Sequence, residues 1–160
     1  MRSPRSSSAE RALAVLAALG LGVAIAGCGG GDSAGATVSV YVAAPLCAAA
    51  KAELAAHGAA AGNFRIAARC LAPSGRAGAG VDLATDGSNS RRATQDTSAV
   101  ATVESPGPGN VFTRSILGSA GIPLVTASSG RGGMKRVIEA VESAGSANVR
   151  ESVAEALEPT

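Results

Sequence analysis

Short apolar runs alternate with longer amphipathic stretches over most of the chain. Four runs are rich in β-branched or other apolar residues and short enough to be strands, at residues 37–42, 63–71, 99–103 and 122–126. Five stretches place apolar residues at helical spacing, at residues 47–57, 82–95, 111–119, 134–144 and 147–157. Glycine, proline and serine concentrate at residues 73–80, 105–110 and 128–133, which predicts loops there. The predicted order is therefore β-α-β-α-β-α-β-α-α.

Each pair of consecutive predicted strands leaves room for a helix between them. Parallel strands need such crossovers, and the connections are right-handed. Residues 99–103 form a near-continuous apolar run, which is typical of a strand covered on both faces. The pattern predicts an α/β fold with a doubly wound, four-stranded parallel sheet flanked by helices. Residues 37–160 are enough for one such domain with a single core.

The amino-terminal part of the chain has the layout of a secretory signal. An apolar run at residues 12–26 follows a polar start that carries Arg2, Arg5 and Arg11. The run is shorter than the roughly eighteen residues of a membrane-spanning helix. An uncleaved anchor, or a plain signal with a chance cysteine, remains the alternative. We expect a signal peptide at 1–27 and a flexible glycine-rich tether at 28–36.

Charge is balanced once the predicted signal is set aside. The whole chain has a formal net charge of +2, and three arginines and one glutamate precede Cys28. The remaining eleven Lys and Arg residues equal the eleven Asp and Glu residues. A neutral domain argues against a nucleic-acid partner, because backbone phosphates require a basic surface.

Catalytic signatures are missing from the sequence. It contains no Cys-x-x-Cys or His-Glu-x-x-His pattern, and His57 falls at the end of a predicted surface helix. The turn at residues 43–46 lacks the glycine fingerprint of a dinucleotide site. We therefore expect no enzymatic activity, no cofactor and no metal.

Two cysteines of the predicted domain are expected to meet at one edge of the sheet. Cys47 begins the first helix, and Cys70 ends the second strand, which should lie beside the first. An exported protein folds in an oxidising compartment, so we predict a disulfide. The alternative is two buried thiols that act as small hydrophobic groups.

Residues 25–28, Ile-Ala-Gly-Cys, resemble the lipobox of bacterial lipoprotein precursors. The resemblance implies that the sulfur of Cys28 carries a diacylglyceryl group and that Cys28 becomes the new amino terminus. The protein would then be anchored by lipid at the extracytoplasmic face of a bacterial cell membrane.

Three further stretches, residues 38–42, 96–105 and 120–129, together with the lipobox resemble the amino-terminal lobe of type I periplasmic binding proteins. The closest type is the leucine/isoleucine/valine-binding receptor of ABC importers. The resemblance implies a small amino-acid-like ligand and an ABC permease as partner. Because it covers one lobe, we expect the second lobe to be missing or supplied by another chain.

In that family the turns after the third and fourth strands bind the ligand's carboxylate and amino groups. We therefore predict ligand contacts from Ser105, Ser128, Ser129 and Gly130, with Tyr41 as a further candidate. The following helix starts would favour an anionic group. The alternative is that these serines only cap those helices.

Glu104 departs from the small hydroxyl residues expected there and would repel a carboxylate. A single lobe would also leave a ligand half exposed, so we expect affinity no better than roughly millimolar. The alternative function is a non-catalytic interaction module that binds another protein or self-associates.

Overall fold

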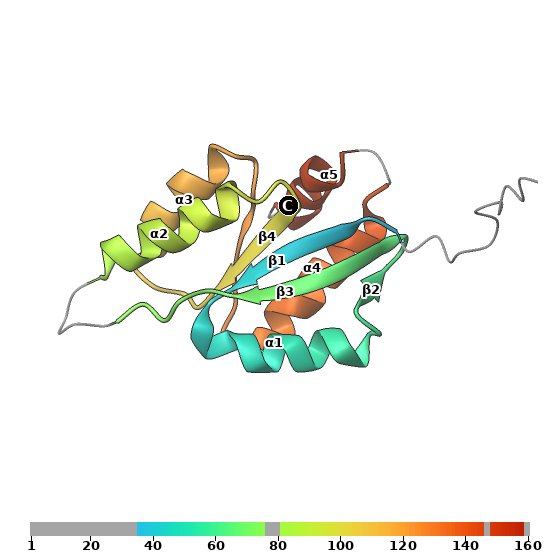
Figure 1. The fold of residues 1–160 in the computed structure, drawn as a ribbon, viewed down its shortest axis with the longest axis horizontal. Helices are drawn as coiled ribbons and strands as arrows, with labels where there is room; N and C mark the ends of the chain where they lie inside the picture. Colours follow the sequence, from blue (N-terminus) through green and yellow to red (C-terminus); the bar gives the residue numbers. More distant parts are fainter. Residues whose placement is uncertain (1–34, 76–80, 146–147, 159–160) are drawn as a thin grey trace, which may run out of the picture. The chain divides into compact units, whose positions relative to one another are not determined.

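The computed structural model describes residues 35–75, 81–145 and 148–158 (Figure 1). The predicted signal peptide and Cys28 lie outside these residues. The elements are β1 (Thr37–Val42), α1 (Ala44–Ala56), β2 (Ala60–Ala61), β3 (Phe64–Cys70), α2 (Leu83–Thr94), β4 (Ala99–Glu104), α3 (Asn110–Gly118), β5 (Leu124–Thr126), α4 (Gly130–Ser143) and α5 (Val149–Leu157).

The sheet has the strand order β2-β3-β1-β4-β5. Strand β1 pairs in parallel with β3 and β4, and β5 pairs in parallel with β4. Strand β2 is antiparallel to β3. The predicted α/β class, with a mostly parallel sheet flanked by helices, is confirmed.

The predicted count of four strands is wrong, because the sheet has five. The extra strand is the two-residue β2, whose alanines carry no strand signal. Gly58, Ala59 and Gly62 have positive φ angles of 69°, 55° and 54°, and they turn the chain back beside β3. This strand forms because of the local backbone geometry of the turn, which hydrophobic periodicity does not predict.

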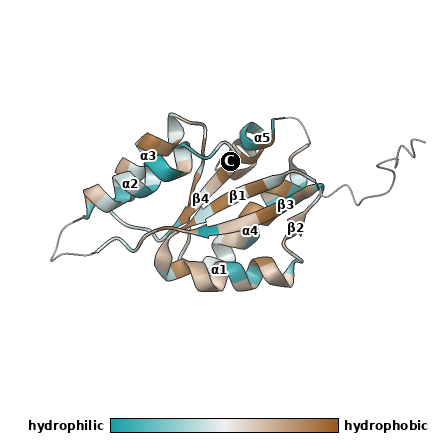
Figure 2. Ribbon diagram, in the orientation of Figure 1, coloured by the Kyte–Doolittle hydropathy of each residue, from teal (hydrophilic) through white to brown (hydrophobic). Residues whose placement is uncertain are grey.

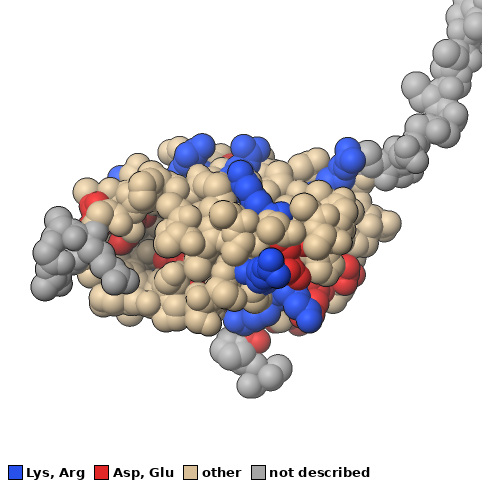
Figure 3. All heavy atoms as spheres, turned by 90° about the horizontal axis from the view of Figure 1, so that it is seen from below, with Lys and Arg blue, Asp and Glu red and all other residues tan. Residues whose placement is uncertain are grey.

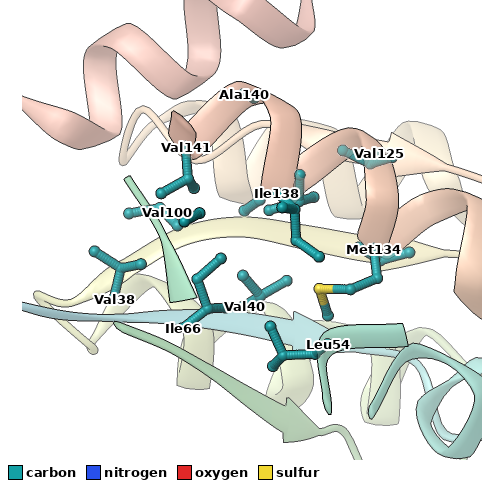
Figure 4. Close-up of a cluster of buried hydrophobic side chains, with 14 of the residues drawn as sticks. Val38, Val40, Leu54, Ile66, Val100, Val125, Met134, Ile138, Ala140 and Val141 are labelled. Atoms are coloured by element: carbon teal, nitrogen blue, oxygen red, sulfur yellow. The ribbon is translucent and has the colours of Figure 1, made fainter. Parts of the chain in front are cut away.

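Two hydrophobic clusters lie on opposite faces of the sheet. The larger one joins side chains of the strands to α1, α4 and α5, and Val40, Leu54, Met134 and Ile138 are among its members (Figure 4). The smaller one includes Tyr41 and Leu124 together with Leu117 of α3. Strands β1 and β4 are buried along most of their length, in keeping with their largely hydrophobic colouring in Figure 2. The core is mainly aliphatic because the chain offers so few aromatic residues.

The predicted disulfide is confirmed. Cys47 and Cys70 are bonded, with their Cα atoms 5.6 Å apart. The alternative of two free thiols is wrong, because parallel pairing of β1 and β3 brings the start of α1 beside the end of β3. The bond therefore ties α1 to the carboxyl edge of the sheet.

Helix α4 begins earlier than predicted. Residues 130–133 were expected in a loop because three of them are glycines, yet α4 starts at Gly130. The side chain of Ser129 accepts a hydrogen bond from the backbone N–H of Gly132 at 3.2 Å. A Cβ atom at Gly130 would overlap the carbonyl oxygen of Leu46. Glycine is therefore needed there for close packing of α4 on α1.

Candidate functional site

A cleft of about 930 Å³ opens at the carboxyl edge of the sheet, where β1, β3 and β4 end. Its walls are the turn at residues 43–45, the segment at 71–75, the start of α2 and the loop at 104–110. Carboxyl ends of parallel strands share one edge of a sheet, and open α/β sheets bind ligands there. The cleft is therefore the candidate site.

Three carboxylates line this cleft, from Asp82, Asp86 and Glu104, and the described residues of its lining include no Lys, Arg or His. Figure 3 shows acidic atoms around a hollow at the left of the view. Asp82 caps the amino terminus of α2 by accepting a hydrogen bond from the backbone N–H of Thr85 at 3.1 Å. That bond lowers the pKa of Asp82.

Glu104 is the last residue of β4 and is half-buried. The amide nitrogen of Asn110 donates to Glu104 Oε2 at 2.9 Å, and Asn110 Oδ1 accepts from the backbone N–H of Gly107 at 2.6 Å. Asn110 thus folds the loop over the end of β4. Burial raises the pKa of Glu104 despite this hydrogen bond, and the negative charge of Asp86 raises the pKa further.

Asn89 of α2 holds the wall formed by residues 71–75. Its amide nitrogen donates to the carbonyl oxygen of Ala72 at 2.9 Å, and its Oδ1 accepts from the backbone N–H of Ala72 at 3.2 Å. Asn89 is not among the residues predicted from the sequence to form the site. A polar amide on the inward face of a predicted helix could have indicated this role. A buried amide needs hydrogen-bond partners for both its oxygen and its nitrogen.

The predicted ligand residues are divided between two places. Ser105 lines the cleft, whereas Ser128, Ser129 and Gly130 are not among its lining residues. Ser128 and Ser129 are exposed. Ser129 caps α4, which is the alternative role considered for these serines. Their contact with a ligand stays a prediction.

Tyr41 lies inside a polar cluster away from the cleft lining. It is 3% exposed, and its hydroxyl donates to Asp96 Oδ2 at 2.9 Å. Asp96 Oδ1 also accepts from the backbone N–H and the hydroxyl of Ser98, at 2.9 and 2.6 Å. Burial alone would raise the pKa of Asp96, but the bonds from Ser98 and Tyr41 hold this pKa at about 2. This cluster joins β1 to the start of β4.

His57 caps the carboxyl end of α1 and is exposed. Its Nδ1 lies 3.0 Å from the carbonyl oxygen of Glu53.

In residues 35–75, 81–145 and 148–158, no three His, Cys, Asp or Glu side chains are grouped to hold a metal ion. Every helix within the same ranges is too short or too polar to cross a bilayer.

No protein-family model, curated protein or solved structure matches this chain.

Proposed function

We propose that this protein is a lipid-anchored, extracytoplasmic domain that binds a small molecule in the cleft at the ends of β1, β3 and β4. In this proposal the domain is doubly wound and built like one lobe of a type I periplasmic binding protein. The observation that carries the proposal is the cleft of about 930 Å³, which is large enough for a small organic ligand.

The strand order supports this location. From β1 the chain crosses to β3 on one side, and it later returns to β4 on the other side. A reversal of this kind creates a crevice between the two central strands, where doubly wound sheets bind ligands. The cleft lining includes Ala43, directly after β1, and Ser105, directly after β4.

The remaining parts of the proposal come from the sequence. Cys28 would carry the lipid, residues 28–36 would tether the domain, and an ABC permease or a separate second lobe would be its partner. In this proposal the domain binds without catalysis, and the described residues of the cleft lining include no histidine, cysteine or lysine.

A pair of matched serine substitutions tests the site. Ser105→Trp places a large side chain in the cleft, whereas Ser128→Trp places one on the exposed turn after β5. We expect a panel of amino acids, amines and carboxylic acids to yield at least one binder by calorimetry on the detergent-solubilised full chain. Ser105→Trp should abolish that binding and Ser128→Trp should retain it. No binder in the panel, or equal binding by both variants, would contradict the proposal.

An interaction module is the second candidate, and one observation favours it. The exposed large hydrophobic residues among those described are Val81, Leu83, Val111 and Phe112. Each lies within two residues of a cleft-lining position. A patch of exposed apolar side chains is typical of a protein contact. A dimer mass in solution that Val111→Ser converts to a monomer would support this alternative.

A further inference from the structure

We infer that the ligand of this cleft is a small organic cation with an apolar body, whose positive group pairs with Glu104. The inference rests on the proposed function, because it takes the cleft as the site and names only the class of ligand. It departs from the carboxylate ligand that the family resemblance implies.

Two of the three carboxylates in the cleft already face a helix amino terminus. Asp82 caps α2 through Thr85. Asp86 lies against Gly109, the residue before α3, since a Cβ atom at Gly109 would be 3.0 Å from Asp86 Oδ2. A helix terminus carries only about half a positive elementary charge, so each carboxylate more than offsets the dipole it faces. Neither helix start is left free to attract an anionic ligand.

No positively charged side chain among the described residues of the cleft lining balances Glu104. Its polar neighbour Asn110 supplies a neutral amide, and its charged neighbour Asp86 is also negative. A half-buried carboxylate has lost part of its hydration. Its electrostatic attraction for a cation is therefore stronger than that of an exposed carboxylate. A carboxylate ligand at the same place would instead meet repulsion from three negative groups.

The rest of the lining favours an apolar body beside the charged group. Leu71, Pro73, Val81 and Pro106 line the cleft between and around the carboxylates. Apolar walls around a few fixed polar groups are typical of small-molecule sites.

Three probes that share one aliphatic side chain separate the effects of charge. They are the cation 3-methylbutan-1-amine, the zwitterion leucine and the anion 4-methylpentanoate. Binding to the detergent-solubilised full chain is measured by calorimetry at neutral pH and low salt. We expect the amine to bind at least about tenfold more tightly than leucine, and the acid to bind most weakly.

Two glutamine substitutions then identify the carboxylate. Glu104→Gln should weaken amine binding by about tenfold or more, which is the usual scale for a hydrogen bond to a charged group. Glu139→Gln is the matched control, since Glu139 is exposed on α4 with its side chain 60% accessible, and it should leave binding unchanged.

The outcomes separate this inference from the proposed function. Tighter binding of the acid, equal binding of all three probes, or amine binding that Glu104→Gln does not weaken would overturn the cationic class. If Ser105→Trp still abolished the binding observed, the cleft would remain the site. Absence of binding by every probe would also overturn the inference, and the wider solute panel then decides whether the proposed function fails with it.

Discussion

The amide nitrogen of Asn110 lies 2.9 Å from Glu104 Oε2, so the first residue of α3 is hydrogen-bonded to the last residue of β4. The loop between them is closed by this contact and by the bond from Gly107 N–H to Asn110 Oδ1. One wall of the cleft is therefore a short, fixed loop, and a carboxylate is held at its base.

Removing the charge of Glu104 should stabilise the domain at neutral pH. Burial raises the pKa of Glu104 above its ordinary value of 4.5, so its ionised form is disfavoured by folding. The native state then binds more protons than the unfolded state, and stability falls as pH rises from 4.5 through the folded pKa. Glu104→Gln should raise the free energy of unfolding at pH 7, and the gain should vanish below pH 4.5. Urea denaturation at several pH values measures this, with Glu139→Gln as the control that should change nothing.

The opposite pH dependence is expected for Asp96. Its pKa falls from 3.8 to about 2 on folding, so its contribution to stability is present above pH 3.8 and is lost as pH falls through about 2. Asp96→Asn should lower the free energy of unfolding by about 1–2 kcal/mol at pH 7, after allowance for partial solvent screening. A deficit that stays constant down to pH 2 would contradict the role of its charge.

The disulfide should contribute substantially to stability. Cys47 and Cys70 are 23 residues apart, and closing a loop of that length stabilises the fold by about 3 kcal/mol in the chain-entropy model. Replacing both cysteines by alanine should lower the free energy of unfolding by that amount. A reducing agent should destabilise the wild type and leave the double variant unaffected. Equal unfolding midpoints for oxidised and reduced wild type would rule this out.

Thr102 and Thr113 form a matched pair for a test of buried hydroxyl groups. Both side chains are 1% exposed. Thr113 Oγ1 donates to the carbonyl oxygen of Gly109 at 3.2 Å, whereas Thr102 Oγ1 is the buried side-chain atom of the described residues that has no partner. Thr102→Val should stabilise the domain by about 1 kcal/mol, and Thr113→Val should destabilise it by a similar amount. Thermal unfolding measures both, and destabilisation by Thr102→Val would indicate a partner for that hydroxyl.

Most of the fold could be predicted from hydrophobic periodicity, because β1, β3, β4 and β5 are short apolar runs between amphipathic helices. Strand β2 could not be predicted in this way, because its two alanines pair with β3 only as a result of the turn that precedes it. The contacts of Arg150 also could not be predicted from the sequence. Its guanidinium donates to the carbonyl oxygens of Ala99 at 2.8 Å and Thr97 at 2.8 Å, contacts that depend on where α5 packs.

The candidate site was predicted in part. The position of Ser105 at the carboxyl end of a strand follows from the order of elements, and the structure places it in the cleft. Asp82, Asp86 and Asn89 were missed because the sequence does not fix which face of α2 meets the sheet edge. Tyr41 does not line the cleft, because its hydroxyl donates to Asp96, just before β4, and its contact with a ligand stays a prediction.

The most direct test of the cleft as the binding site is a map of ligand-induced backbone amide shifts. The ¹⁵N-labelled full chain in detergent is titrated with 3-methylbutan-1-amine. We predict that the largest shifts fall on residues 71–75 and 104–110, and that Ser128, Ser129 and Gly130 move little. Shifts centred on residues 128–130, or no shifts at saturating amine, would contradict the account.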